Sequence, residues 1–209
     1  MSTFDPKHTV VVATGNAHKL AEIRAILGAS PALEQMDFVA LGDLGDFPEP
    51  EEDGETFFEN ALIKARAALD QTGMCMAVAD DSGLVVDALD GAPGIFSARW
   101  AGEHGNDEAN NDRLLAQMEG VPDGKRSARF HSSVAFVLRD EDGEEALCGE
   151  GDCEGSIAHN RLGNNGFGYD PLFELADIPG KRMAELEPHE KNAISHRRRA
   201  LDDLVAKLS

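Results

Sequence analysis

The chain has 209 residues, of which 39 are acidic and 19 are basic, so its formal net charge is −20 at pH 7. Such a charge repels a nucleic-acid backbone unless the basic residues are strongly segregated, so no nucleic-acid partner is expected. The length can bury a substantial core without covalent staples, and the three cysteines form neither a disulfide framework nor a zinc pattern.

Neither a targeting signal nor a membrane span is evident in the sequence. The opening MSTFDPKH lacks the apolar core of a signal peptide. No apolar run approaches the roughly 20 residues that a membrane helix needs. We therefore expect a cytoplasmic protein without a membrane partner.

A strand, a tight turn and a helix are predicted at the start of the chain. Val10 to Thr14 form a continuous apolar or β-branched run, typical of a strand buried on both faces. After this run, apolar residues recur at helical spacing, and Asn16 stands where an N-cap is expected. A helix N-terminus gathers unpaired N–H groups that attract phosphate, and Lys19 adds a positive charge. Because the P-loop and dinucleotide signatures are absent, the stretch is either another anion site or simply the first βα unit of an α/β fold.

An acidic loop and a capped helix come next. A short strand over 38–41 leads into the Pro- and Gly-containing loop 43–56. Thr56 and Glu59 have the spacing of a capping box, which predicts a helix that carries Lys64.

The rest of the chain continues to alternate strands and helices without repeats or a long linker. We expect, in order, a strand over 74–79, a turn over DDSG, a returning strand over 84–89, a helix over 107–118, a hairpin of 127–138 with 145–152, and a helix from Pro188 through Leu208. The pattern predicts a single α/β domain, possessing one or two lobes, over 1–209.

Two pairs of carboxylates suggest a metal site. Asp80 and Asp81 stand at the carboxyl end of an apolar strand, where α/β folds bind ligands. Glu51 and Glu52 lie in the acidic loop. Magnesium is usually held by one or two carboxylates with substrate phosphates and water, so these pairs fit that ion. The alternatives are a hairpin turn and a solvated acidic surface.

Two further stretches could recognise a ligand. In EKNAISHRRRAL, a continuous helix would place Lys191, His196 and Arg197 on one polar face. In NNGFGYDP, the glycines allow close backbone approach and Phe167 offers a flat stacking surface. The alternatives are a solvated basic helix face and a bulged strand with a core phenylalanine.

Taken together and in this order, six stretches between 10 and 197 resemble the inosine triphosphate pyrophosphatase (HAM1-like) family. They are ATGNAHKLAEI, EEDGETFFENALIKA, ADDSGLVVDALDGAPGIFSARWAG, RFHSSVAFV, GFGYDPLF and EKNAISHR. The resemblance implies an ITPase-like (Maf/HAM1-like) α/β fold, with a twisted mixed central sheet flanked by helices and a substrate cleft between two lobes.

The resemblance also implies roles for individual residues. The triphosphate would be bound by Thr14, Gly15, Asn16, Ala17, His18, Lys19 and Lys64. Asp81 would be the general base and would bind Mg²⁺, with Asp80, Glu51 and Glu52 supporting the metal. Ser82 would contact the substrate, and the base would be surrounded by Phe167, Gly168, Tyr169, Asp170, Lys191, His196 and Arg197.

The implied activity is hydrolysis of ITP, dITP and XTP at the α–β phosphoanhydride, giving a nucleoside monophosphate and pyrophosphate, by a homodimer. It would remove deaminated purines from the nucleotide pool. Two alternatives are a Maf-like pyrophosphatase of modified pyrimidine nucleotides and a nucleotide-binding module that does not hydrolyse its ligand.

Overall fold

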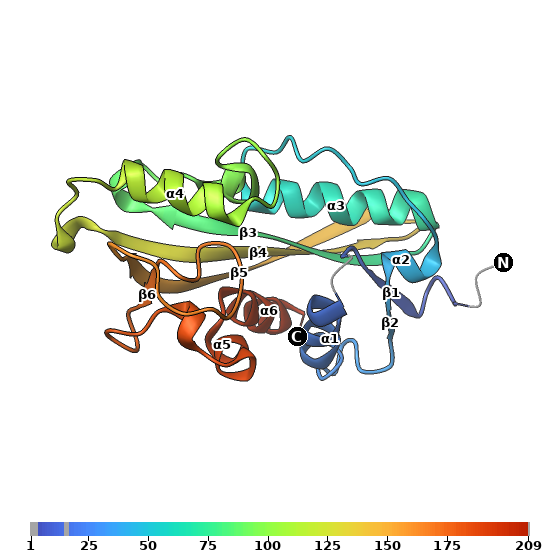
Figure 1. Cartoon of the computed structure of the whole chain (residues 1–209). Helices are drawn as coiled ribbons and strands as arrows, with labels where there is room; N and C mark the ends of the chain where they lie inside the picture. The colour runs from blue at the N-terminus through green and yellow to red at the C-terminus, as the bar shows by residue number, and fades with distance from the viewer. Residues whose placement is uncertain (1–3, 15–16, 209) are drawn as a thin grey trace. The chain divides into compact units, whose positions relative to one another are not determined.

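A computed structural model describes residues 4–14 and 17–208 (Figure 1). Its six strands form one mixed sheet in the order β2-β1-β3-β4-β5-β6. The chain divides into two compact units, the first built from 1–81, 132–151 and 197–209, the second from 82–131 and 152–196. Three long strands contribute to both units: β3 (Met76–Val86), β4 (Ser127–Arg139) and β5 (Glu144–Ile157). The predicted α/β class is confirmed.

The first unit buries its central strand on both faces. Strand β1 (Thr9–Val12) pairs in parallel with β2 (Asp37–Ala40) and with β3. Because successive strand residues point to opposite faces, Val10 and Val12 join one core cluster and Val11 joins another. The first cluster packs under α1 (Ala17–Leu27) and α6 (His196–Lys207) and the second under α3 (Phe57–Thr72), on the opposite side of the sheet (Figure 1). The predicted two-sided burial is confirmed for Val10 to Val12, whereas Ala13 and Thr14 lie beyond the end of β1 and are half-buried.

Local signals set the ends of α3. The Thr56 hydroxyl accepts the Glu59 N–H while the Glu59 carboxylate accepts the Thr56 N–H, so the predicted capping box is confirmed. Gly73 ends the helix in the left-handed conformation, with φ of 70°. A short helix, α2 (Leu41–Leu44), follows β2.

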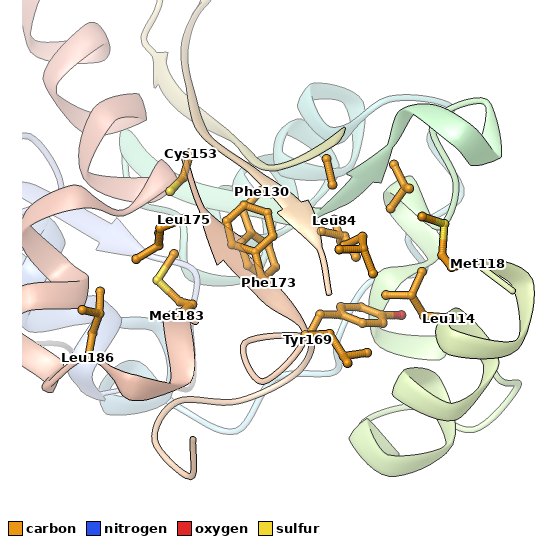
Figure 2. Packing of buried hydrophobic residues seen from close by; sticks show 14 residues of the cluster. Leu84, Leu114, Met118, Phe130, Cys153, Tyr169, Phe173, Leu175, Met183 and Leu186 are labelled. Atoms are coloured by element: carbon orange, nitrogen blue, oxygen red, sulfur yellow. The ribbon is translucent and has the colours of Figure 1, made fainter. Parts of the chain in front are cut away.

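The second unit has its own core. Strand β6 (Phe173–Leu175) pairs antiparallel with β5, and the helices of this unit are α4 (Asp107–Gln117) and α5 (Pro188–Ile194). Phe130 and Phe173 pack with ring centroids 4.5 Å apart at the centre of the cluster that Figure 2 shows. Four 3₁₀ helices complete the secondary structure: η1 (Asp87–Leu89), η2 (Gly94–Arg99), η3 (Asp123–Lys125) and η4 (Met183–Glu185).

Two predictions of local structure were wrong. The DDSG sequence forms no turn, because β3 continues through it as one strand from Met76 to Val86. The Leu84 N–H, which a turn would leave exposed, donates to the buried Ser97 hydroxyl at 2.8 Å. The segment 87–89 is a 3₁₀ helix rather than the end of a returning strand.

The final helix was also predicted as continuous, and it is interrupted at Ser195. This residue is extended, with φ of −65° and ψ of 149°, and it is buried. Serine is a favourable residue directly before a helix, so the chain ends α5 and begins α6 there. The expected continuous helix, with Lys191, His196 and Arg197 on one polar face, is therefore not formed.

Within 4–14 and 17–208, no helix is long and apolar enough to cross a membrane.

Candidate functional site

Asp80 is a buried carboxylate held by two cations. Its side chain is 2% exposed, and it accepts from Lys19 Nζ at 3.0 and 3.1 Å and from Arg197 Nε at 2.9 Å. Burial alone would raise the pKa of this carboxyl, but the Arg197 guanidinium and the Lys19 ammonium outweigh it and hold the pKa well below its usual range. Asp80 is therefore ionised at neutral pH and joins β3 to α1 and α6.

Asp81 points to a different group of residues. Lys64 Nζ lies 3.0 Å from Asp81 Oδ1 and 3.4 Å from Glu52 Oε1, and Asn60 Nδ2 lies 3.4 Å from Asp81 Oδ2. The separation from the partners of Asp80 follows from the strand, because adjacent residues of β3 face opposite sides. Asp81, Glu52 and Lys64 thus bring two carboxylates and a lysine together from three segments of the chain.

The electrostatics of this second group suit acid–base chemistry. Burial raises the pKa of Asp81 even though Lys64 opposes the shift. The pKa of Lys64 is also raised, because attraction to Asp81 and Glu52 outweighs its burial. A carboxylate with a raised pKa is a stronger base than an ordinary surface aspartate, so Asp81 is suited to accept a proton.

Only part of the predicted metal set is brought together. Asp81 and Glu52 both approach one positive charge, that of Lys64 Nζ, so this pair fits a cation when phosphates and water complete its coordination. Asp80 is occupied by Lys19 and Arg197, and Glu51 is exposed. Among residues 4–14 and 17–208, no three carboxylate, histidine or cysteine side chains meet as a metal-binding group.

The predicted phosphate turn is described in part. Gly15 and Asn16 lie outside the described residues, and the structure describes no side chain for Ala17 and His18. Thr14 follows β1 and is half-buried, and Lys19 lies in the first turn of α1. Lys19 thus lies at the N-terminal turn of α1, where its ammonium pairs with Asp80, and anion binding there stays a prediction.

In the second unit, Phe167 and Lys191 come together. The Phe167 side chain is 64% exposed, and Lys191 Nζ lies 4.2 Å from the centroid of its ring. Asp170 is buried and accepts from Lys191 Nζ and from the Phe167 N–H, the latter at 2.9 Å. Burial raises the pKa of Asp170, and Lys191 opposes this shift. An exposed aromatic ring on a bonded backbone suits a binding surface better than a core position.

The remaining predicted residues are placed as follows. Tyr169 is buried, and its hydroxyl donates to the Ser97 carbonyl at 2.9 Å, so it supports the loop from inside. His196 is buried with its ring stacked on Phe130 at 5.3 Å between centroids. Ser82 is half-buried on β3.

The family model described as the Ham1 family matches residues 10–207. The chain belongs to the Ham1 family.

Relatives within the Ham1 family match the chain along nearly its whole length. A dITP/XTP pyrophosphatase of Corynebacterium efficiens is 49% identical over 201 residues, which cover 94% of this chain and 95% of that protein. One of Geobacter sulfurreducens is 50% identical over 192 residues, or 92% of each chain. A solved HAM1 protein from Coxiella burnetii is 42% identical with a TM-score of 0.84, covering 96% of this chain and 98% of its own. The ITPase-like fold is thereby confirmed.

Sequence reasoning missed several residues that contact the candidate site. Asn60 reaches Asp81 from α3, where the only signal was its position one turn before Lys64. Glu22 lies 3.6 Å from Arg197 Nη1, and its signal was its position three residues after Lys19 on α1. Asp107 and Asn111 of α4 bind the loop that carries Phe167, and no local pattern in the sequence predicts these contacts.

Proposed function

We propose that this chain hydrolyses ITP, dITP and XTP at the α–β phosphoanhydride to a nucleoside monophosphate and pyrophosphate. The observation that carries the proposal is the group of Asp81, Glu52 and Lys64, in which a half-buried carboxylate of raised pKa meets a second carboxylate and a lysine. The names of the Ham1-family relatives, dITP/XTP pyrophosphatase, supply the substrate class.

The residues of the first unit would bind the phosphates and move the proton. Lys19 and Lys64 would neutralise phosphate charge, which is the main requirement of this chemistry. Asp81 would accept the proton of the attacking water as the new P–O bond forms and the bond to pyrophosphate breaks. The turn residues Thr14, Gly15, Asn16, Ala17 and His18 would bind the triphosphate with them.

Mg²⁺ is the proposed metal. Asp81 and Glu52 would hold it together with substrate phosphates. Asp80 and Glu51 would support the metal site without belonging to that pair. When bound, it would supply positive charge to the phosphates and lower the pKa of a coordinated water.

The residues of the second unit would bind the base. Phe167 would stack on the purine, and contacts to its edge would come from Gly168, Tyr169, Asp170, Lys191 and His196, with Ser82 also touching the substrate. Arg197 or a backbone N–H would select a 6-oxo purine, and the described bonds of Arg197 lead to Asp80 and Glu22. Selection would follow because adenine presents an amino donor where the site offers another donor, which leaves a buried group unpaired.

The test is release of pyrophosphate and orthophosphate from inosine, xanthosine, guanosine and adenosine triphosphates, with magnesium and with chelator. We expect magnesium-dependent pyrophosphate release from the first two, lost in Asp81→Asn. Asp70→Asn is the matched control, because Asp70 is an exposed carboxylate that pairs with Arg139. Release of orthophosphate, or equal rates with all four nucleotides, would contradict the proposal.

The remaining expectations are that residues 1–209 act as one two-lobed domain, and that the protein is a cytoplasmic homodimer. These stay predictions, and sedimentation of the purified protein tests the dimer.

A further inference from the structure

The backbone N–H and the backbone carbonyl of Gly168 are both hydrogen-bonded by side chains of α4. The Gly168 N–H donates to Asp107 Oδ2 at 2.7 Å. The Gly168 carbonyl accepts from Asn111 Nδ2 at 2.8 Å. Asp107 and Asn111 are four residues apart, so they lie on the same face of α4. One face of α4 thus fixes the backbone of Gly168, the residue that directly follows Phe167.

This helix face is itself well fixed. Asn111 is 3% exposed, and its Nδ2 also donates to the Asp107 carbonyl at 2.7 Å, which orients the amide. Leu114 of α4 and Met118, the residue directly after the helix, pack in the same buried cluster as Tyr169 (Figure 2). The helix therefore provides a rigid base for the loop.

The loop conformation depends on these bonds rather than on side-chain packing at Gly168. This glycine has φ of +60°, and a Cβ built on it would meet nothing within 4 Å. Glycine is therefore needed for its backbone conformation and not for lack of space. Asp170 accepts the N–H of Phe167, so consecutive backbone N–H groups are each bonded to a carboxylate.

Phe167, between the exposed Gly166 and the half-buried Gly168, is itself open to solvent, at 64% exposure. A large apolar side chain gains nothing from exposure, whereas bonding its backbone so completely costs conformational freedom. Such a combination is expected where a ring must be presented at a fixed orientation to a ligand.

We propose that Asp107 and Asn111 are positioning residues that hold the Gly168 peptide and thereby set the Phe167 ring for stacking of the purine base. The role of the ring rests on the proposed function. Asp107 and Asn111 themselves touch no substrate, and they act through the loop backbone.

Two measurements test the inference on the full chain. Amide hydrogen exchange of peptides covering 164–172 should become faster in Asp107→Ala, because the Gly168 N–H loses its acceptor. Calorimetry with magnesium should show inosine monophosphate binding weakened about ten- to a hundredfold, the range that misplacement of a positioning group produces, while pyrophosphate binding stays unchanged. Asp107→Asn retains an acceptor oxygen and should restore much of both properties.

Glu108→Ala is the matched control, since Glu108 is an exposed carboxylate of the same helix turn that pairs with Arg161. It should leave both properties unchanged. Asn111→Leu should reproduce the binding defect, and if this buried change prevents folding, Asp107→Ala still decides.

Unchanged exchange in Asp107→Ala would overturn the inference, as would faster exchange with normal inosine monophosphate binding. Equal weakening of pyrophosphate binding would show a general structural defect and would also overturn it. Failure of the proposed function would instead appear in the wild-type protein, as absent pyrophosphate release.

Discussion

Asp80 provides the sharpest test of how the first unit is stabilised, through the substitution Asp80→Asn. The side chain is almost fully buried, and its carboxylate lies 2.9 Å from Arg197 Nε and 3.0 Å from Lys19 Nζ. At an effective dielectric constant of about 20, each pair is worth about 5.5 kcal/mol before desolvation is subtracted. Asparagine keeps the shape and an acceptor oxygen, but it removes the negative charge that Lys19 and Arg197 share, and Glu22, 3.6 Å from Arg197 Nη1, offsets that loss only in part.

The expected loss is smaller than the gross attraction, because burying the ions costs free energy that the pairs only partly offset. Removing one partner of a buried ion pair typically costs about 3–5 kcal/mol. Since the free energy of unfolding of a domain is about 5–15 kcal/mol, Asp80→Asn should remove a large share of it. The carboxylate is ionised well below neutral pH, so the loss should be complete at pH 7.

The assay is urea unfolding at pH 7 of the wild type, Asp80→Asn, Arg197→Met and the double variant. The double variant should lose less than the sum of the single variants, because removing Arg197 relieves one uncompensated charge. Asp202→Asn is the control, since Asp202 pairs with Arg198 on the exposed face of α6 and should cost less than about 1 kcal/mol. A loss below about 1 kcal/mol in Asp80→Asn would refute the reasoning. Losses of unfolding free energy that simply add in the double variant would also refute it.

Three further predictions address other parts of the molecule. Arg126→Leu should lower the free energy of unfolding by about 3 kcal/mol or more, because the buried guanidinium donates to four backbone carbonyls that leucine leaves unpaired; urea unfolding measures this. Gly149→Ala should cost about 1–3 kcal/mol in the same assay, since its Cβ would lie 2.2 Å from the Ala200 carbonyl oxygen, whereas Gly42→Ala meets nothing within 4 Å and should cost much less. Arg197→Ala should reduce hydrolysis of inosine triphosphate more than that of adenosine triphosphate; the ratio of the two rates cancels any loss of folded protein, and an unchanged ratio would exclude a selective contact.

The elements that were predicted correctly are those whose signals are local. Of the apolar run at 10–14, Val10 to Val12 are buried on both faces of β1, and the Thr56 capping box begins α3. The hairpin of 127–138 with 145–152 matches β4 and β5. In each case the signal lies in residues within a few positions of one another, so the sequence pattern contains it even where the partners are distant.

Two of the errors arose where local propensity and the folded conformation disagree. A buried aspartate inside a strand is unfavourable by local propensity, which is why DDSG resembled a turn. Lys19 and Arg197, 61 and 117 residues away from Asp80, supply the charges that make the strand possible. Similarly, the residues around Ser195 favour a continuous helix, yet Ser195 is buried and the chain changes direction there.

By itself, the sequence determined the α/β class, most strands and helices, and the stretches that carry the chemistry, because hydrophobic periodicity, caps and motifs act over short distances. Only the tertiary structure decided that Asp80 and Asp81 face different partners, that Glu52 rather than Glu51 meets Lys64, and that Asp107 and Asn111 hold the Phe167 loop. These choices depend on which side of a strand or helix a side chain occupies and on what is packed opposite it, and that information is absent from any local pattern.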